Sequence, residues 1–249
     1  MFNKKCLSQF ILIVVLSLIC SVQAYAFLAN DQGQTKSNVS QVQTRQEHEI
    51  IVLVHGLMRS SLSMSFLKAY LERQGYQVYS YNYPSAKYSI QEHGAHFTQF
   101  IEELLIKNPG IKIHFVTHSL GGIIAREAIA NLNQKQLKNL GCLIMLAPPN
   151  QGSNLAKLFT KIFPLFNYMI KPLAELSSDQ KAYVHQVPIP NIKIGIIAGR
   201  YDAKVPPAAT RLAGQKEPIV INATHTFIMN KAESKKLIVK FLKKGAFED

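Results

Sequence analysis

Ser119 is the residue best placed to act as a nucleophile. It lies in the sequence THSLGG at residues 117–122, between an apolar segment and an amphipathic one. A sharp turn from a strand into a helix would expose the serine hydroxyl above the carboxyl edge of a sheet, as in a nucleophile elbow. Gly121 relieves crowding in such a turn, but Thr117 stands where the motif usually has glycine, so we expect local strain. The alternative role for Ser119 is a helix N-cap.

A serine hydroxyl is a poor nucleophile until a base accepts its proton, and the base in turn needs an orienting group. Asp202 follows the apolar segment 192–198, at a loop position beyond a predicted strand, where the sites of α/β proteins are built. His225 is the only histidine after Asp202 and follows the apolar segment 218–221. The remaining aspartates lie near the chain ends or in a stretch without a predicted strand: Asp31, Asp179 and Asp249. We therefore predict a catalytic triad of Ser119, Asp202 and His225.

A site for the negative charge of a reaction intermediate is expected after the first apolar segment, residues 50–55. Gly56 permits a bend there, so that the backbone N–H of Leu57 can point toward the nucleophile. Together with the N–H of Leu120, directly after the serine, it would form an oxyanion hole. His55 ends the same segment, and we expect it to bind backbone groups rather than substrate.

These residues require a framework in which strands and helices alternate. Strands are predicted for the segments that are apolar throughout: residues 50–55, 78–83, 111–116, 142–147, 192–198 and 218–221. Helices are predicted for the amphipathic segments between and after them: residues 61–74, 90–107, 120–132 and 231–243. Wholly apolar strands separated by helices indicate a mostly parallel sheet with helices on both faces, so the predicted fold class is α/β.

Residues 150–190 interrupt this alternation, because they contain no predicted strand. The stretch is divided by prolines and is rich in apolar side chains, including several aromatic ones: Phe159, Phe163, Phe166 and Tyr168. Placed after the segment 142–147, it would lie beside the edge that holds Ser119. Two interpretations remain open, namely ordinary helices that cover the sheet and a small lid or cap over the site.

The first residues have the pattern of an export signal. Lysines precede an apolar run at residues 10–22, and an Ala-x-Ala sequence follows it. We predict a signal peptide over residues 1–26 and an exported protein, periplasmic or secreted. An uncleaved anchor is the less favoured alternative, because the apolar run is short for a membrane span. The polar residues 27–48 are predicted to form a disordered leader before one domain at residues 49–249.

The composition restricts the partners. The formal net charge of +13 favours anionic surfaces, and contact with an anionic membrane surface is one expectation. The lysines between residues 231 and 244 fit the solvated face of a helix. The sequence has no zinc-finger cysteines and no aromatic-basic RNA motif, so nucleic acid is not an expected partner. No obligate protein partner is indicated.

Cofactor chemistry has little support in the sequence. It contains no G-x-G loop for a dinucleotide and no P-loop for a nucleotide. His93 and His96 share a predicted helix face, but an exposed histidine pair is a better interpretation than a metal site. Cys142 lies in an apolar run and is expected to be a buried, inert thiol. We expect no cofactor and no metal ion.

Taken together, the motifs resemble those of the α/β-hydrolase superfamily, in particular bacterial lipases and carboxylesterases. The resemblance rests on VLVHGL at residues 52–57, on THSLGG at residues 117–122, and on Asp202 and His225 in that order. The sequence LAPPNQGS at residues 146–153 is similar to the segment that follows a strand in lipase-like members.

This resemblance implies a compact α/β-hydrolase domain with a possible small helical lid. It implies a serine esterase or lipase that cleaves carboxylic esters through an acyl-enzyme, with a small-molecule or lipid ester as substrate. It also assigns the oxyanion donors to Leu57 and Leu120. An acyltransferase or thioesterase with the same triad is the first alternative, and a non-catalytic binding protein on this fold is a less favoured one.

Overall fold

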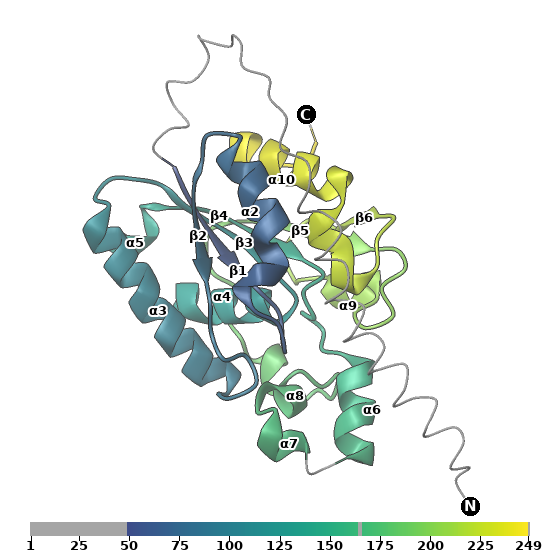
Figure 1. Ribbon diagram of the computed structural model, residues 1–249. Helices are drawn as coiled ribbons and strands as arrows, with labels where there is room; N and C mark the ends of the chain where they lie inside the picture. Colours follow the sequence, from purple (N-terminus) through teal and green to yellow (C-terminus); the bar gives the residue numbers. More distant parts are fainter. Residues whose placement is uncertain (1–48, 164–165, 249) are drawn as a thin grey trace, which may run out of the picture. The chain divides into compact units, whose positions relative to one another are not determined.

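The computed structural model describes residues 49–163 and 166–248, which contain a 6-stranded sheet (Figure 1). The strands are β1 (Ile50–Val54), β2 (Gln77–Tyr81), β3 (Ile113–His118), β4 (Leu140–Leu146), β5 (Lys193–Gly199) and β6 (Ile219–Ile221). Their spatial order is β2-β1-β3-β4-β5-β6, and every neighbouring pair is parallel. The predicted parallel α/β sheet is confirmed, and each strand overlaps the segment predicted for it. The predicted signal peptide and leader lie outside the described residues.

Helices follow most of the strands. The α-helices are α2 (Ser65–Glu72), α3 (Ile90–Lys107), α4 (Leu120–Ala130), α5 (Gln134–Leu137), α6 (Asn154–Ile162), α7 (Phe166–Met169), α8 (Pro172–Glu175), α9 (Pro207–Thr210) and α10 (Ala232–Lys244). The 3-10 helices are η1 (Ser61–Met64), η2 (Tyr183–His185) and η3 (His225–Asn230). Among the helices of the described part of the chain, none is both long and apolar enough to span a bilayer.

Both faces of the sheet are covered by helices, α3 and α4 on one face and α2 and α10 on the other (Figure 1). Alternate residues along β1 show the division. Ile50 and Val52 pack in the same apolar cluster as α3 and α4, whereas Ile51 and Leu53 pack in the cluster of α2 and α10. A strand buried on both faces needs no polar side, which explains why these segments are apolar throughout.

The connections diverge at the carboxyl ends of β1 and β3. The chain leaves β1 for α2 on one face, and it leaves β3 for α4 on the other. In open parallel sheets ligands bind at the carboxyl edge where two adjacent strands diverge in this way. Residues that directly follow β1 and β3 are therefore in the position where a site is expected.

Residues 150–190 lie beyond this carboxyl edge and form α6, α7, α8 and η2 (Figure 1). They are anchored to the segment after β2, because the Lys171 N–H donates to the Ala86 carbonyl oxygen at 3.0 Å. They are also anchored to the start of α3, where the Glu175 carboxylate accepts from the Ile90 N–H at 2.7 Å. The stretch has no strand within its described residues, in agreement with the sequence pattern.

Cys142 in β4 is buried, in agreement with the prediction. Burial raises the pKa of its thiol to about 12. A thiol with this pKa remains protonated near neutral pH, and the thiolate is the reactive form. Cys142 therefore fills space in the core and is not a nucleophile.

Candidate functional site

Ser119 occupies the turn between β3 and α4. Its backbone has φ 52° and ψ −124°, a conformation that residues other than glycine rarely adopt. The turn is held in place because the Ser119 N–H donates to the Leu146 carbonyl oxygen, at the end of β4, at 2.9 Å. The serine side chain makes no cap hydrogen bond to α4. The hydroxyl is therefore available to other groups. The strained backbone at this turn is typical of a nucleophile elbow.

Small residues in α4 make room for this turn. A Cβ atom on Gly121 would lie 2.6 Å from the carbonyl oxygens of both Val54 and His55, so no side chain fits there. A Cβ atom on Gly122 would lie 3.1 Å from the Thr117 Oγ1 atom. The larger residue at position 117 is thus accommodated because residue 122 has no side chain. Thr117 itself retains regular strand pairing with both neighbours of β3.

A chain of hydrogen bonds joins the ends of β3, β5 and β6. The Ser119 Oγ atom lies 3.0 Å from His225 Nε2, and His225 Nδ1 lies 2.7 Å from Asp202 Oδ2. The second carboxylate oxygen of Asp202 accepts from the backbone N–H groups of Lys204 and Val205, at 2.9 and 2.8 Å. Asp202 is 4% exposed, and its carboxylate is fully occupied by these donors. The three side chains predicted to act together are therefore in direct contact, with the imidazole between hydroxyl and carboxylate.

His118, directly before the serine, holds the histidine loop. Its Nε2–H group donates to the backbone carbonyl oxygen of His225 at 2.9 Å, and the two rings lie 4.9 Å apart. Burial is the main reason why the pKa of His118 lies well below its usual value, so the ring is neutral near pH 7. Sequence reasoning noted His118 only as part of the motif and did not foresee this contact across the chain.

The segment after β1 lies against the serine. A Cβ atom on Gly56 would be 3.1 Å from the Ser119 Cβ atom, so only glycine allows this approach. Met58 has φ 53°, and its N–H donates to the Ser85 Oγ atom at 2.8 Å. In contrast, no protein acceptor within the described residues takes up the N–H of Leu57 or of Leu120. These two backbone donors remain available to a ligand beside Ser119.

His55 binds backbone groups, as its position at a strand end suggested. Its Nδ1 atom lies 2.9 Å from the Gly56 carbonyl oxygen, and its ring stacks on Tyr83 at 4.3 Å. The Tyr83 hydroxyl donates to the His55 carbonyl oxygen at 2.8 Å. Burial lowers the pKa of His55, so a neutral imidazole ties the end of β1 to the segment after β2.

A buried arginine in α4 fixes the loops around the site, and no sequence pattern indicated this role. The Arg126 guanidinium donates to the Asn150 side chain at 2.9 Å, to the Pro188 carbonyl oxygen at 3.2 Å, and to the Val187 carbonyl oxygen. Asn150 in turn donates to the Thr210 carbonyl oxygen at 2.8 Å. This network links the loop after β4 to the segment that follows Asp202.

Replacement of Arg126 by methionine is expected to lower the free energy of unfolding by about 3 kcal/mol, because several buried acceptors lose a charged donor. Chemical denaturation measures the change. Arg73→Met, at the exposed C-cap of α2, is the matched control and should alter the unfolding free energy by less than about 0.5 kcal/mol. Equal stability of the Arg126 and Arg73 variants would contradict a structural role for the network.

The prediction that His93 and His96 in α3 are both exposed is wrong for His93. His93 is buried, with ring contacts to Tyr83 and Tyr88, because the aromatic side chains around it cover the helix face. Burial lowers the pKa of His93 to about 4. Within the described residues, no group of three or more histidine, cysteine or carboxylate side chains is arranged to bind a metal ion.

Comparison with known proteins places the chain among α/β hydrolases. Residues 44–172 match the protein family described as "Putative serine esterase (DUF676)". The fold is similar to that of the mature lipase BlEst2 from Bacillus licheniformis, with a TM-score of 0.63, 19% identity, and coverage of 80% of this chain and 93% of that one.

Two further solved structures have the same fold. The metagenomic carboxyl esterase MGS0156 has a TM-score of 0.64 and 18% identity, over 88% of this chain and 82% of its own. YbtT, a type II thioesterase from the yersiniabactin biosynthetic pathway, has a TM-score of 0.58 and 17% identity, over 80% of this chain and 94% of its own. At these identities the likeness is one of fold. The family match covers β1 to β4, the glycines and the serine turn described above, and this chain belongs to the DUF676 serine esterase family and has the α/β-hydrolase fold.

Proposed function

We propose that this chain is a serine hydrolase that cleaves carboxylic esters, with Ser119 as nucleophile, His225 as base and Asp202 as the orienting acid. The observation on which the proposal rests is the uninterrupted hydrogen-bond chain from Ser119 Oγ through the His225 ring to the buried Asp202 carboxylate. The positive φ of Ser119 and the free N–H groups of Leu57 and Leu120 support the same assignment.

Acylation would begin when Ser119 Oγ attacks the ester carbonyl carbon and His225 Nε2 accepts the hydroxyl proton. The carbonyl oxygen becomes an oxyanion, which the N–H groups of Leu57 and Leu120 would stabilise. Asp202 keeps the proton of the imidazole on Nδ1, so that Nε2 presents a lone pair to the serine. Collapse of the intermediate expels the alcohol, which takes the proton from His225 Nε2.

Deacylation would repeat these steps with water as the nucleophile. His225 Nε2 accepts a proton from water, the hydroxide attacks the acyl carbon, and the carboxylic acid leaves as Ser119 recovers its proton. The neutral His118 favours this cycle, because it holds the His225 backbone without adding a full positive charge beside the base. If an alcohol or thiol displaced water, the same residues would transfer the acyl group.

A fluorophosphonate probe tests the proposal directly. The expected result is stoichiometric labelling of the peptide that contains Ser119, with parallel loss of ester hydrolysis and release of free acid as the product. Failure to label the folded protein would instead favour a binding protein on this fold. Transfer of the acyl group to an added alcohol without release of acid would indicate an acyltransferase.

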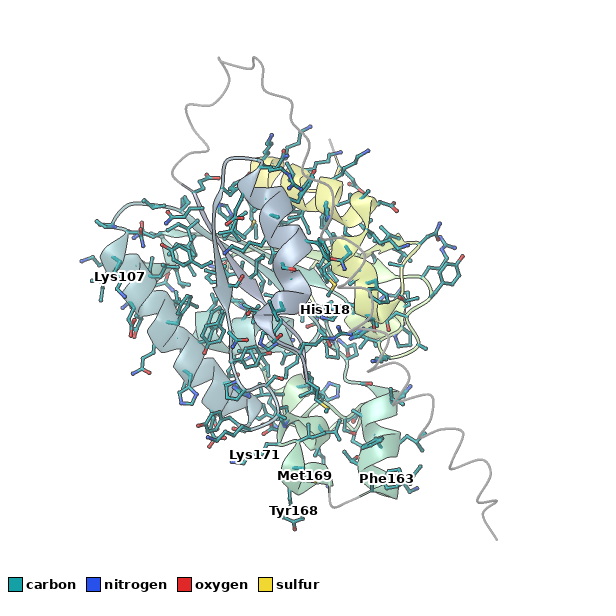
Figure 2. The ribbon with its side chains drawn as sticks, viewed as in Figure 1. Lys107, His118, Phe163, Tyr168, Met169 and Lys171 are labelled. Carbon is teal, nitrogen blue, oxygen red and sulfur yellow. The ribbon has the colours of Figure 1, made fainter. Side chains whose placement is uncertain are left out.

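We further propose an acyl or lipid ester as the substrate, because the carboxyl edge bears exposed apolar side chains. They lie on α6 and α7: Leu155, Leu158, Ile162, Tyr168 and Met169. Figure 2 shows Tyr168 and Met169 at the outer end of the molecule, beyond His118. Apolar side chains in contact with water beside a nucleophile suit an acyl chain. Export through the predicted signal peptide remains part of this proposal on the sequence alone.

Leu158→Ser combined with Ile162→Ser tests this surface, because the two residues are 53% and 56% exposed on α6. Activity on aggregated long-chain esters is expected to fall about thirtyfold, since each of the two side chains loses about 1 kcal/mol of apolar contact, while short soluble esters are spared. Hydrolysis of both substrate classes and the melting temperature measure the effect.

Substitution of Phe159 and Phe163, which are half-buried with rings 5.2 Å apart, is expected to give a contrasting result. Truncation of both side chains should lower the stability of the protein. If the segment is purely structural, activity should fall equally on every substrate. Ile106→Ser is the surface control, because Ile106 is 79% exposed beside Lys107 at the far end of α3 (Figure 2). Uniform loss in the Leu158/Ile162 variant, with a lowered melting temperature, would show that α6 merely covers the sheet.

A further inference from the structure

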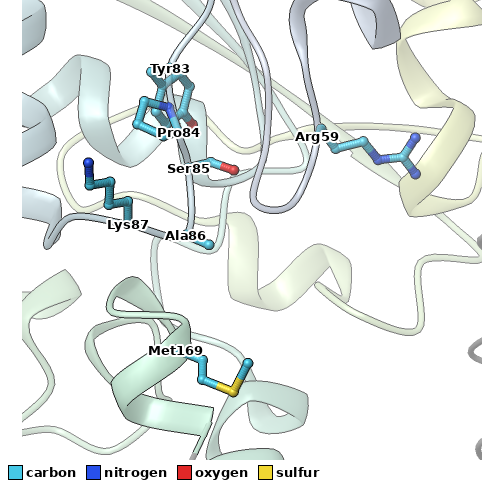
Figure 3. A pocket seen from close by; sticks show the side chains of 7 residues that line it. All are labelled: Arg59, Tyr83, Pro84, Ser85, Ala86, Lys87 and Met169. Carbon is cyan, nitrogen blue, oxygen red and sulfur yellow. The ribbon is translucent and has the colours of Figure 1, made fainter.

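Arg59 lies at the mouth of the site, close after the proposed oxyanion donor Leu57. It lines an open cavity of about 360 Å³ together with Tyr83, Ser85, Met169 and Lys87. Figure 3 shows the guanidinium extending from the loop after β1 and away from Ser85, with Lys87 on the opposite side of the cavity. The loop is fixed by the hydrogen bond between the Met58 N–H and the Ser85 hydroxyl.

Lys204 lies on another loop of the site, two residues after Asp202. Its backbone is held from both directions, because its N–H donates to Asp202 Oδ1 and its carbonyl oxygen accepts from the Ser153 hydroxyl at 2.9 Å. Burial, followed by repulsion from Arg59, lowers the pKa of Lys204. The two cations also act together on His118, the neighbour of the nucleophile. Arg59 and Lys204 therefore lie on two loops of the proposed site, one close after Leu57 and the other close after Asp202.

Neither cation has an acidic partner among the ion pairs of the described residues. The nearest carboxylate, Asp202, is bound to His225. Two other lysines at this edge are neutralised, since Lys157 pairs with Asp179 and Lys171 pairs with Glu92. Lys87 lies over the ring of its neighbour Tyr88.

Two like charges that repel each other and have no counter-ion raise the free energy of the folded protein. An anionic ligand group would relieve this repulsion. The arginine offers a planar fork of donors that fits carboxylate and phosphate oxygens, and the lysine adds a mobile point charge. Because both closely follow residues of the proposed catalytic site, the anionic group would belong to the substrate itself.

We propose that Arg59 and Lys204 form an anion-recognition site beside Ser119, and that the preferred substrates are carboxylic esters bearing a carboxylate or phosphate group near the scissile bond. The inference rests on the proposed ester hydrolysis and defines its substrate class. A half-ester of a dicarboxylic acid and a lysophospholipid share the required chemistry.

Matched substrate pairs test this inference. The first pair is 4-nitrophenyl hemiglutarate and neutral 4-nitrophenyl pentanoate, which differ in a terminal carboxylate. The second pair is lysophosphatidylglycerol and the monoacylglycerol of the same acyl chain, both below their critical micelle concentrations. The wild-type enzyme is expected to favour the anionic member of at least one pair in kcat/KM, mainly through a lower KM. The pair that shows the preference identifies carboxylate or phosphate as the recognised group.

Arg59→Gln and Lys204→Gln are each expected to lower the anionic-to-neutral ratio of kcat/KM about tenfold, as the loss of one favourable charge contact does. Arg59→Lys should keep most of the preference, and Lys204→Glu should reduce it further than Lys204→Gln. Added salt should weaken the wild-type preference, because these charges are accessible to solvent ions. Arg73→Gln, at the C-cap of α2 near the opposite edge of the sheet, should leave the ratio unchanged.

Equal kcat/KM values for both members of each pair in the wild-type enzyme would overturn the inference. The same conclusion follows if the Arg59 and Lys204 variants leave the ratio at the wild-type value. Failure of the proposed function is distinguishable, because in that case neutral 4-nitrophenyl pentanoate shows no hydrolysis that depends on Ser119.

Discussion

Ser119→Ala is expected to lower ester hydrolysis by at least about a thousandfold, as loss of a triad nucleophile usually does. Without the hydroxyl no acyl-enzyme forms, and His225 can only activate water directly. The free N–H groups of Leu57 and Leu120 would still polarise the ester carbonyl, so a small residual rate is expected. A steady-state assay with a short 4-nitrophenyl ester measures the loss.

The fold of the Ser119→Ala protein should be retained, so the loss can be attributed to chemistry. The serine side chain makes no cap to α4, and alanine meets the same backbone strain at φ 52°. Thermal melting and circular dichroism check this point. Ser63→Ala is the matched control, because its hydroxyl donates only to a local carbonyl in η1. Unchanged hydrolysis by purified Ser119→Ala protein would falsify Ser119 as the nucleophile.

The sheet could be predicted because its central strands are buried on both faces. Each of these strands appears as a mostly apolar run, and the helices between the runs require parallel pairing. The positions of Ser119, Asp202 and His225 followed from the same argument, since all three come directly after such runs. Parallel strands end at one edge, so residues that follow different strands meet there.

Contacts between distant segments could not be predicted in this way. The Arg126 network joins residues that lie far apart in the sequence, and nothing in the sequence near Arg126 distinguishes it from an exposed helix arginine. His93 was misjudged because its burial depends on the rings of Tyr83 and Tyr88, which precede α3 and lie outside its helical pattern. Hydrophobic periodicity describes one helix at a time and does not report which neighbour covers a polar side chain.

The interpretation of residues 150–190 also depended on information that the sequence lacks. Apolar side chains on α6 fit equally well against a sheet or toward a ligand. In the structure α6 exposes Leu158 and Ile162 while Phe159 is half-buried, so the helix presents apolar residues on more than one side. The experiments on α6 can separate the two roles because the two sets of residues differ in exposure.

Asp202→Asn is expected to lower kcat for ester hydrolysis by about a thousandfold or more, with the fold intact. The asparagine oxygen can still accept from the N–H groups of Lys204 and Val205, which fixes the orientation of the amide. The amide NH2 group then faces His225 Nδ1 and donates to it. This forces the imidazole proton onto Nε2, the atom that must accept the proton of Ser119, so the base is present in the wrong tautomer.

Asp179→Asn is the matched control, because Asp179 is the other internal aspartate within the described residues. Its carboxylate pairs with Lys157 and accepts from the Ser177 hydroxyl, and these contacts lower its pKa. Its side chain is 55% exposed, so the loss of one solvent-screened surface ion pair should change kcat less than twofold and leave the melting temperature almost unchanged. Parallel kcat measurements and melting curves decide the assignment. A large loss in the Asp179 variant with a small one in the Asp202 variant would transfer the role of orienting acid to Asp179, and the contact between Asp202 and His225 would then be structural.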